Sequence, residues 1–518
     1  MIGSTSRSIT SARAGGVTAA AGTAHASNIA AAAANRPAHL RAHTALTAAP
    51  WIRDRTRDRS DVPGGPLSLT NLSRTCQEPG EKVNGTAHAI GRGCGVCQAR
   101  TVRIDRLGDL GSAPQVLRAV GEATVRLGLP PPAALIGDWF GALAVIAPSV
   151  SIQPVDPVHA FGIRPGSTIT AVGGGWIGYL SYPDPGADGR PARIPAAAGG
   201  WTDCVLRRDT GGQWWYESLS GARMPTWLTD ALAAPVPRRT CQIQWGPADR
   251  AAHRDAVLAC LAAIRDGEVY QACVCTQFGG AVDGEPLDFF ADGVARTAPA
   301  RAAYVAGDWG AVASLSPELF LRRRGDAVIS SPIKGTLPLD HCPSRLRGSV
   351  KDVAENIMIV DLVRNDLSRV AVTGTVRVPE LLVVRAAPGV WHLVSTVSAQ
   401  VPVEVPMSSL LEAAFPPASV TGTPKLRARQ LISQWEPNRR GIYCGTVGLA
   451  SPMAGCELNV AIRTVEFDAA GHAVLGAGGG ITADSDVETE WGECLHKAAP
   501  VFGQTTATRA GTALATGP

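Results

Sequence analysis

The residues of this sequence most suited to chemistry begin with one glutamate. Lys351–Arg369, KDVAENIMIVDLVRNDLSR, contains no Gly or Pro and predicts a single helix of about five turns. At helical spacing Glu355 shares a stripe with Met358, Ile359 and Leu362, so its carboxylate belongs to the face that should be buried. A buried ion is costly unless it is paired or coordinated. Glu355 is therefore predicted to face an arginine, a lysine or a metal ion.

A second acidic group lies near the C-terminus. Val487–Ala499 predicts a helix capped by Asp484–Asp486, on which Glu490, Glu493 and Lys497 fall on one face. One interpretation is a solvated stripe with a Glu–Lys pair at i and i+4. The run of glycines just before this helix permits close approach of the backbone to a ligand, which favours a site instead.

Lysine is rare in this chain. Of 48 basic residues only five are lysine, and these are Lys82, Lys334, Lys351, Lys425 and Lys497. Where charge alone is needed the sequence uses arginine, so a lysine is expected where only an amine serves, either to attack carbon or as a compact charge. Chance survival is the alternative, and it suffices for Lys82. Glu318 and Lys334 each lie at or beside the end of a predicted strand, where loops carry function.

The elements that must position these residues alternate between strands and helices. Apart from the two helices above, the pattern predicts a helix over His253–Asp266, stopped by Gly267, and a turn with the start of a helix at Val420–Lys425. Strands are predicted over the apolar runs Phe140–Ala147, Trp176–Tyr182, Val390–Thr396 and Asn459–Thr464.

Bulk composition excludes some classes of function. The 518 residues suffice for one large domain or two ordinary ones. The net charge of +4 comes from residues 1–100, which hold 12 basic and 5 acidic residues, whereas the remainder holds 36 and 39. This slightly acidic body gives no case for nucleic-acid binding. No segment approaches the roughly 18 apolar residues of a membrane span.

The ends of the chain carry little pattern. Residues 1–101 predict a disordered or low-complexity leader and residues 504–518 a flexible tail. The acid-free start also resembles an organellar transit peptide, and translation from near Val102 is another possibility. The twelve cysteines are dispersed and predict reduced core residues of a cytoplasmic protein. Cys94 and Cys97 have the spacing of half a zinc site, but no second pair follows.

A series of motifs identifies a family resemblance. In chain order they are GEVYQACVCTQF, LSPELF, PIKGT, KDVAENIMIVDLVRNDLSRV, VWHLVST, VTGTPK, RRGIYCG, NVAIRT, and GGGITADSD followed by the E..E...K helix. Together they resemble the chorismate-utilising enzymes, which comprise anthranilate synthase component I, aminodeoxychorismate synthase component I, and the isochorismate and salicylate synthases. The match is dense over residues 246–503 and loose over 102–245, where GGGWIGYLSY carries it.

The resemblance implies an α/β fold of two interleaved lobes with large, mainly antiparallel β-sheets flanked by helices. Residues 102–245 would form the N-terminal segment of this sandwich and residues 246–503 the chorismate-binding catalytic domain.

Two positions favour the aminodeoxychorismate synthase component I branch. Anthranilate synthases usually have alanine where this chain has Lys334, and the isochorismate and salicylate synthases usually have a water-activating lysine where it has Gln271. The implied reaction converts chorismate and ammonia to 4-amino-4-deoxychorismate, toward p-aminobenzoate and folate. Ammonia would come from a separate glutamine amidotransferase subunit, component II. Anthranilate synthase, an isochorismate- or salicylate-type synthase, and a silent subunit that only binds chorismate or a partner remain alternatives.

The resemblance also implies roles for single residues. Glu355 and Glu493 would hold Mg²⁺, with Glu490 as an outer or water-mediated ligand, because hard carboxylate oxygens suit this ion. Glu318 would be the general acid that protonates the departing C4 hydroxyl, and Lys334 would attack C2. The substrate would contact Gln271, His392, Thr421, Tyr443, Arg463, Gly478, Gly479, Gly480 and Lys497.

The sequence departs from the family pattern at several places. Cys273 replaces an Asn, Pro417-Ala418 replaces a Gly-Gly, and Trp391 replaces the first of two histidines. Roughly seven residues fewer separate Lys334 from Glu355 than in typical members. None of the expected catalytic residues is lost.

Overall fold

A computed structural model describes residues 102–503 apart from 169, 185–189 and 237–238. The predicted leader, the predicted tail and the Cys94/Cys97 pair lie outside the described residues. Within the described part, no helix is long and apolar enough to cross a membrane.

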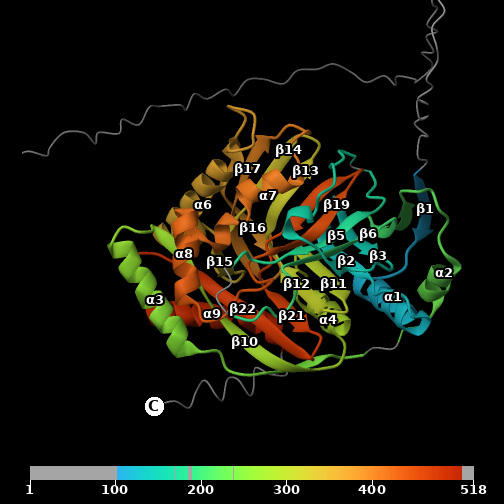
Figure 1. The fold of residues 1–518 in the computed structure, drawn as a ribbon, viewed down its shortest axis with the longest axis horizontal. Coiled ribbons are helices and arrows are strands. Elements are labelled where there is room, and N and C mark those ends of the chain that lie inside the picture. The colour runs from blue at the N-terminus through green and yellow to red at the C-terminus, as the bar shows by residue number, and fades with distance from the viewer. Residues whose placement is uncertain (1–101, 169, 185–189, 237–238, 504–518) are drawn as a thin grey trace, which may run out of the picture. The chain divides into compact units, whose positions relative to one another are not determined.

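Two large antiparallel sheets form the centre of the fold (Figure 1). In spatial order the first contains β1 (Arg103–Gly108), β8 (Trp214–Ser218), β7 (Cys204–Arg208), β3 (Ala142–Ala147), β2 (Ala133–Trp139), β11 (Arg301–Gly307), β12 (Gly310–Ser316), β21 (Thr464–Asp468), β22 (His472–Ile481), β10 (Gln271–Asp283) and β18 (Gly422–Thr423), with β9 (Gln242–Trp245) also paired to β10.

The second sheet contains β15 (Ile333–Pro338), β17 (Val390–Gln400), β14 (Ala327–Ser331), β13 (Leu319–Arg324), β20 (Gly455–Asn459), β19 (Thr446–Ser451), β5 (Gly175–Leu180), β6 (Ala197–Thr202) and β4 (Gln153–Pro154), with β16 (Arg377–Ala387) also paired to β17. Both sheets take strands from before and after residue 245, as the predicted interleaved α/β fold requires.

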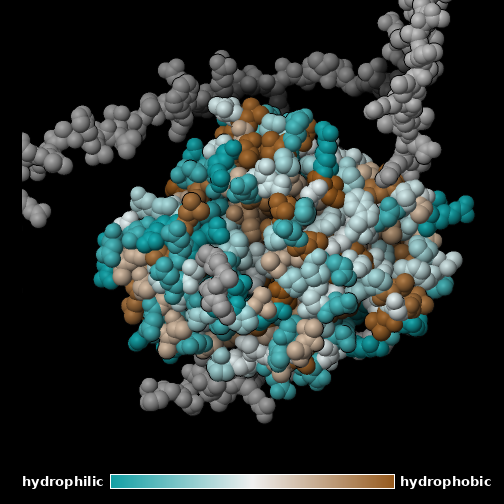
Figure 2. All heavy atoms as spheres, in the orientation of Figure 1, coloured by the Kyte–Doolittle hydropathy of each residue, from teal (hydrophilic) through white to brown (hydrophobic). Residues whose placement is uncertain are grey.

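Helices cover the sheets. They are α1 (Ala113–Leu127), α2 (Thr226–Ala233), α3 (Arg250–Arg265), α4 (Pro286–Thr297), α5 (Ser344–Gly348), α6 (Val350–Ser368), α7 (Met407–Ala414), α8 (Lys425–Trp435) and α9 (Val487–Phe502), with short 3-10 turns η1 (Pro157–His159) and η2 (Ala418–Val420). In Figure 1, α3, α6 and α8 lie on one side and α1 and α2 on the other. Figure 2 shows hydrophilic residues over the α6 and α8 side.

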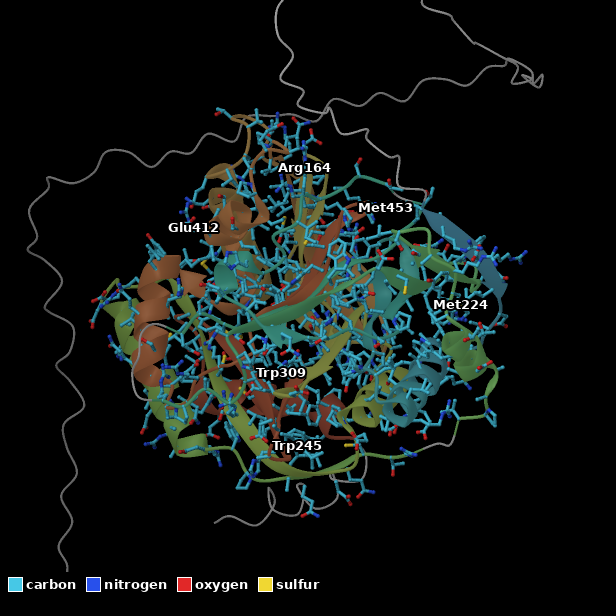
Figure 3. The ribbon with its side chains drawn as sticks, turned by 45° about the vertical axis from the view of Figure 1, so that its right-hand side comes forward. Arg164, Met224, Trp245, Trp309, Glu412 and Met453 are labelled. Atoms are coloured by element: carbon cyan, nitrogen blue, oxygen red, sulfur yellow. The ribbon has the colours of Figure 1, made fainter. Side chains whose placement is uncertain are left out.

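The cores follow from this layering. One core lies between the sheets, where Leu135 and Val312 of the first sheet pack with Ile177 and Leu449 of the second. Trp309, labelled in Figure 3, packs against this core, and the centroids of its ring and of the Tyr179 ring lie 5.1 Å apart. Other cores lie under α1, α4 and α9, under α6 and α7, and under α3 and α8. Strands covered on both faces carry almost continuous apolar runs.

Most predicted elements are confirmed within two or three residues. The helix around Glu355 is α6, the predicted helix at His253 is α3, and the last helix is α9. The prediction of a strand over Asn459–Thr464 is wrong. β20 ends at Asn459 and β21 starts at Thr464, because Arg463 adopts φ +51°, which interrupts an extended backbone. The apolar run hides this turn, since the residues are buried on both sides of it.

Candidate active site

Two neighbouring glycines of β22 stand among the acidic residues. A methyl group at Gly480 would lie 3.1 Å from Glu355 Oε2, 3.3 Å from Lys334 Nζ and 3.5 Å from Gln271 Oε1. A methyl group at Gly479 would lie 3.0 Å from Glu490 Oε2 and 3.4 Å from Glu493 Oε1. A side chain at either position would crowd the groups beside it, which is a physical reason for glycine here. Helices α6 and α9, distant in sequence, thus bring their carboxylates to the end of one strand.

Each of the three glutamates faces one lysine. Lys334 Nζ lies 3.7 Å from Glu355 Oε2, Lys351 Nζ 2.7 Å from Glu490 Oε1, and Lys497 Nζ 2.5 Å from Glu493 Oε1. We call these six residues the carboxylate cage. It uses three of the five lysines of the chain and is neutral when all six groups are ionised.

Burial and the neighbouring lysines shift the pKa values of the acidic groups in opposite directions. Burial raises the pKa of Glu355, although Lys334 and Lys351 act to lower it. Burial also acts on Glu493, but Lys497 outweighs it and the pKa of Glu493 is lowered. Repulsion by the charge of Glu493 also acts to raise the pKa of Glu355.

The fit of the cage to a divalent cation rests on its oxygens. Glu490 is 1% exposed, and its Oε2 is buried without a hydrogen-bond partner. A buried carboxylate oxygen without a partner is costly, so a cation or an ordered water is expected beside it. Among the described residues no three His, Cys, Asp or Glu side chains are arranged to hold a metal ion unaided. The orphaned Glu490 Oε2 is thus the feature of the cage that would fit a hard cation such as Mg²⁺, which keeps waters among its ligands.

Lys334 points into this cage and not toward bulk solvent. It belongs to β15, which pairs with the inner strand β17, and its side chain is 13% exposed. Lys425, another scarce lysine, is structural. Its Nζ donates to Asp366 Oδ2 at 2.5 Å and to the carbonyls of Ala414 and Pro416 at 2.9 Å.

Glu318 occupies the connection between β12 and β13. Its N–H donates to Ser316 Oγ at 3.1 Å, and its carbonyl accepts the Val460 N–H, which together fix the backbone. The side chain is 3% exposed, and burial raises its pKa from 4.5 to about 7. No direct contact with the cage glutamates is seen in the described structure, but the charges of Lys334 and Lys497 act to lower this pKa.

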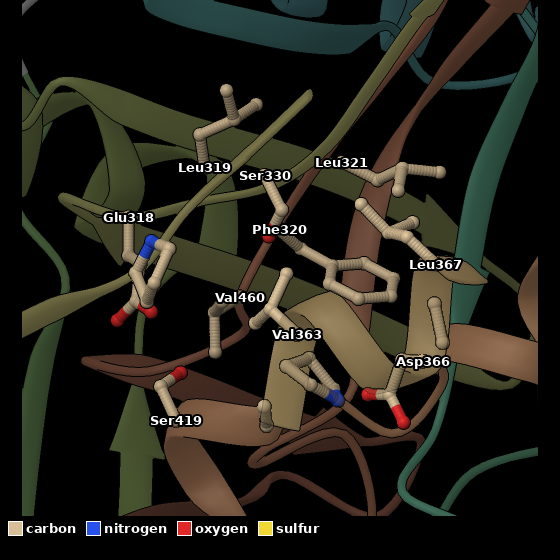
Figure 4. Close-up of a pocket in the computed structure, with 14 residues that line it drawn as sticks. Glu318, Leu319, Phe320, Leu321, Ser330, Val363, Asp366, Leu367, Ser419 and Val460 are labelled. Atoms are coloured by element: carbon tan, nitrogen blue, oxygen red, sulfur yellow. The ribbon is translucent and has the colours of Figure 1, made fainter. Parts of the chain in front are cut away.

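A largely apolar pocket borders Glu318. Figure 4 shows the Glu318 carboxyl at one side, Asp366 of α6 at the other, and Phe320 and Val363 between them. Walls of this kind provide little solvation for a charge, which is the physical reason why the neutral acid is favoured.

Arg463 and His392 form a cationic and hydrogen-bonding wall. Burial lowers the pKa of Arg463, and no acidic neighbour among the described residues offsets this effect. Nδ1 of His392 and Oγ1 of Thr336 form a hydrogen bond of 3.0 Å, whereas the buried Nε2 of His392 has no hydrogen-bond partner. Burial, followed by the charge of Arg463, lowers the pKa of His392 to about 4. A guanidinium without a carboxylate and an unused imidazole nitrogen together suit an anionic ligand.

The β22 backbone offers further donors. Cys273 donates its N–H to the Thr421 carbonyl and Cys275 donates to Glu436 Oε1, so both point away from β22. In an antiparallel pair, two residues that lie opposite each other either both direct their N–H groups toward the partner strand or both direct them away from it. Their partners Gly480 and Gly478 therefore turn their N–H groups away from β10, whereas Gly479, opposite Val274, turns toward it. The backbone favours the predicted anion-binding role for Gly478 and Gly480 but not for Gly479.

The remaining predicted residues border the same region. Gln271 starts β10, and its buried Oε1 lacks a partner. Tyr443 covers Gly476, where a methyl group would meet its ring at 2.2 Å. Thr421 is buried and donates its hydroxyl to the Pro417 carbonyl at 2.8 Å, and Lys497 donates to the Gly478 carbonyl at 2.8 Å. Gln271 and Lys497 thus lie at the cage, and the roles of all these residues stay predictions.

Sequence reasoning gave no role to two residues of the site. Lys351 holds Glu490 Oε1 from the first turn of α6, and Ser485 Oγ donates to the same oxygen at 2.6 Å. The scarcity of lysine was a usable signal for Lys351. Ser485 resembled an ordinary cap residue, and nothing in the sequence separates the two functions.

Comparison with known proteins shows the family to which the chain belongs. Residues 153–503 match the family of chorismate binding enzymes. The chain belongs to this family. Aminodeoxychorismate synthase component 1 of Klebsiella aerogenes is 43% identical over 242 residues, which are 45% of this chain and 53% of that protein. Aminodeoxychorismate synthase of Streptomyces pristinaespiralis is 35% identical over 360 residues, which are 62% and 50% of the two chains. The matched part spans about half the length of these relatives.

Solved structures agree on the fold. Anthranilate synthase component I from Streptococcus pneumoniae superposes with a TM-score of 0.59 at 22% identity, covering 81% of this chain and 95% of that one. The menaquinone-specific isochorismate synthase from Escherichia coli gives 0.57 at 19% identity, covering 78% and 95%. The predicted α/β architecture with large antiparallel sheets is confirmed.

Proposed function

We propose that this chorismate binding enzyme family member is an aminodeoxychorismate synthase component I, which converts chorismate and ammonia to 4-amino-4-deoxychorismate. The observation that carries the proposal is the amine of Lys334, 13% exposed and 3.7 Å from Glu355 inside the carboxylate cage. An amine in this place can act as a nucleophile toward a bound ring. The names of the relatives from Klebsiella and Streptomyces support the same reaction.

Chorismate carries two carboxylates, and the site offers two kinds of partner. Arg463, His392 Nε2 and the outward N–H groups of Gly478 and Gly480 suit the enolpyruvyl carboxylate. The carboxylate cage suits Mg²⁺, held by Glu355 and Glu493 with Glu490 nearby, and the bound ion would anchor and polarise the ring carboxylate. The orphan Glu490 Oε2 is the feature that supports a cation here.

The proposed reaction uses Glu318 and Lys334 in sequence. Glu318, neutral because of burial, donates its proton to the C4 hydroxyl, which leaves as water while Lys334 Nζ bonds to C2 and both conjugated double bonds of the ring shift. Ammonia then bonds to C4, both double bonds shift back, and the C2–Nζ bond breaks to release Lys334. The proton lost by the new amine returns to Glu318, so protons balance over the cycle.

The proposal also covers the choice of nucleophile, the source of ammonia and the cellular compartment. Gln271 stands beside Gly480 and is not a base, so water near it would not be activated as a nucleophile. A partner glutamine amidotransferase, component II, would supply ammonia, and the product would feed p-aminobenzoate and folate synthesis. The described cysteines are all free, which suits a reducing cytoplasm.

The test incubates the purified protein with chorismate, Mg²⁺ and an ammonium salt, with products separated by chromatography. We expect 4-amino-4-deoxychorismate that depends on ammonium. Anthranilate formed without a lyase, or isochorismate or salicylate formed with water alone, would contradict the proposal. Binding of chorismate with no turnover, even with a partner glutaminase, would support a silent subunit instead.

A further inference from the structure

Lys351 is the one member of the carboxylate cage to which neither the sequence analysis nor the proposed reaction gives a role. It lies in the first turn of α6, its side chain is 36% exposed, and its Nζ lies 2.7 Å from Glu490 Oε1. Of the other two lysines of the cage, Lys497 is 42% exposed but has a second hydrogen-bond acceptor, and Lys334 is less exposed than Lys351. Lys497 also donates to the Gly478 carbonyl, and Lys334 is 13% exposed.

One carboxylate oxygen of Glu490 accepts two hydrogen bonds, and the other oxygen has no hydrogen-bond partner. Ser485 Oγ, five residues before it, donates to Oε1 at 2.6 Å, and Lys351 donates to the same atom from another helix. Oε2 is buried without a partner. The geometry of Glu490 is thus set locally by Ser485, whereas Lys351 contributes mainly charge.

That charge matters because three carboxylates meet here. Without Lys351 the cage would carry a net negative charge, and like charges in a partly buried site repel strongly. Burial acts to lower the pKa of Lys351, but Glu490, Glu355 and Glu493 outweigh it and raise the pKa. The direct contact of the ammonium is its ion pair with Glu490 at 2.7 Å.

A divalent cation entering the same cage would meet this ammonium as a like charge. Lys351 has a flexible stem, partial exposure and a single hydrogen-bond partner among the described residues, so it can turn toward solvent at small cost. We propose that Lys351 is an internal counter-ion of the carboxylate cage, which keeps the cage assembled without metal and gives way when a divalent cation binds. This inference rests on the proposed Mg²⁺ site.

The test compares Lys351→Met, which removes the charge, with Lys351→Arg, which keeps it. Ser485→Ala is the matched control, since it removes the other hydrogen bond to Glu490 Oε1 without a change in charge. Binding of Mn²⁺ is measured by electron paramagnetic resonance and confirmed by competition with Mg²⁺. Thermal melting is measured in EDTA and in saturating Mg²⁺, so the readouts do not depend on activity.

We expect Lys351→Met to bind Mn²⁺ roughly tenfold more tightly than the parent, because the cation no longer has to displace a competing positive charge from the cage. Its melting temperature should fall in EDTA and recover in Mg²⁺. Lys351→Arg should bind as the parent does, and Ser485→Ala should bind no more tightly than the parent.

The outcomes separate the two proposals. If the parent binds neither Mn²⁺ nor Mg²⁺, the metal site and this inference both fail. If the parent binds Mn²⁺ and Lys351→Met binds it equally or more weakly, the metal site stands and the counter-ion role of Lys351 is refuted. Tighter binding in Ser485→Ala as well would also refute it, because the effect would then not depend on charge.

Discussion

Replacement of Glu318 by glutamine tests whether this carboxyl is held neutral for acid catalysis. Burial raises its pKa from 4.5 to about 7 while the side chain stays 3% exposed. In the unfolded chain the group loses its proton near pH 4.5, but in the folded protein only near pH 7. Its stabilising contribution is therefore complete below about pH 4.5 and is lost as the pH rises through 7. A shift of this size corresponds to about 3 kcal/mol in the free energy of unfolding.

Glu318→Gln cannot ionise, so it escapes this loss. We expect the variant to be more stable than the parent by about 3 kcal/mol at pH 8, with little difference at pH 4.5. Urea unfolding followed by tryptophan fluorescence at the two pH values measures this. Turnover should fall by about 10²–10⁴-fold, because the acid is removed. Parent turnover should fall about tenfold for each pH unit above 7.

Glu217 provides the matched control. It is fully buried, but it accepts N–H groups from Val172 and Gly173 at 2.6 and 2.9 Å and pairs with Arg207. Glu217→Gln leaves Arg207 without its partner and should destabilise the protein at pH 8 by about 3 kcal/mol. If Glu318→Gln were destabilised at pH 8 in the same way, or kept full turnover, the argument for a neutral buried acid would be refuted.

Three other substitutions test the rest of the site. Lys334→Ala should abolish formation of 4-amino-4-deoxychorismate while calorimetry still detects chorismate binding; unchanged turnover would exclude a covalent role. Arg463→Gln should raise KM more than it lowers kcat, by about tenfold or more, in steady-state kinetics, and an unchanged KM would remove it from the carboxylate site. Gly480→Ala places a methyl 3.1 Å from Glu355 Oε2 and should reduce turnover sharply, whereas Gly492→Ala in α9 meets nothing within 4 Å and should be neutral or slightly stabilising in thermal melts.

The sequence predicted the helices that carry the cage because their signals are local. Glu355 stands out on α6 only because its neighbours at i+4 and i+7, Ile359 and Leu362, are apolar and are indeed buried. The ionic partners were not predictable in this way. Lys351 and Glu490 are 139 residues apart and meet only because α6 and α9 converge at the end of β22. Hydrophobic periodicity carries no information about such a contact.

At Arg463 the local sequence signal itself was misleading, because it predicted a strand where the backbone turns. Val460 and Ala461 are buried in different cores, so the run has the composition of a strand although the backbone turns there. Its positive φ at an arginine is the unfavourable feature that composition cannot reveal. Arg463, at this turn, carries a charge that acts with burial to lower the pKa of His392. Strained backbone of this kind is a hint of function that only coordinates provide.

The charges of the site suggest why glutamate and lysine occur there in equal number. Without ligands, three carboxylates and three ammonium groups cancel, so the protein can fold around them without a buried net charge. A divalent cation alone would bring two positive charges into a neutral cage, and chorismate alone two negative ones. Together they add no net charge, so each should favour binding of the other. A cage balanced in this way suits a metal that arrives with its dianionic substrate better than one that is bound permanently.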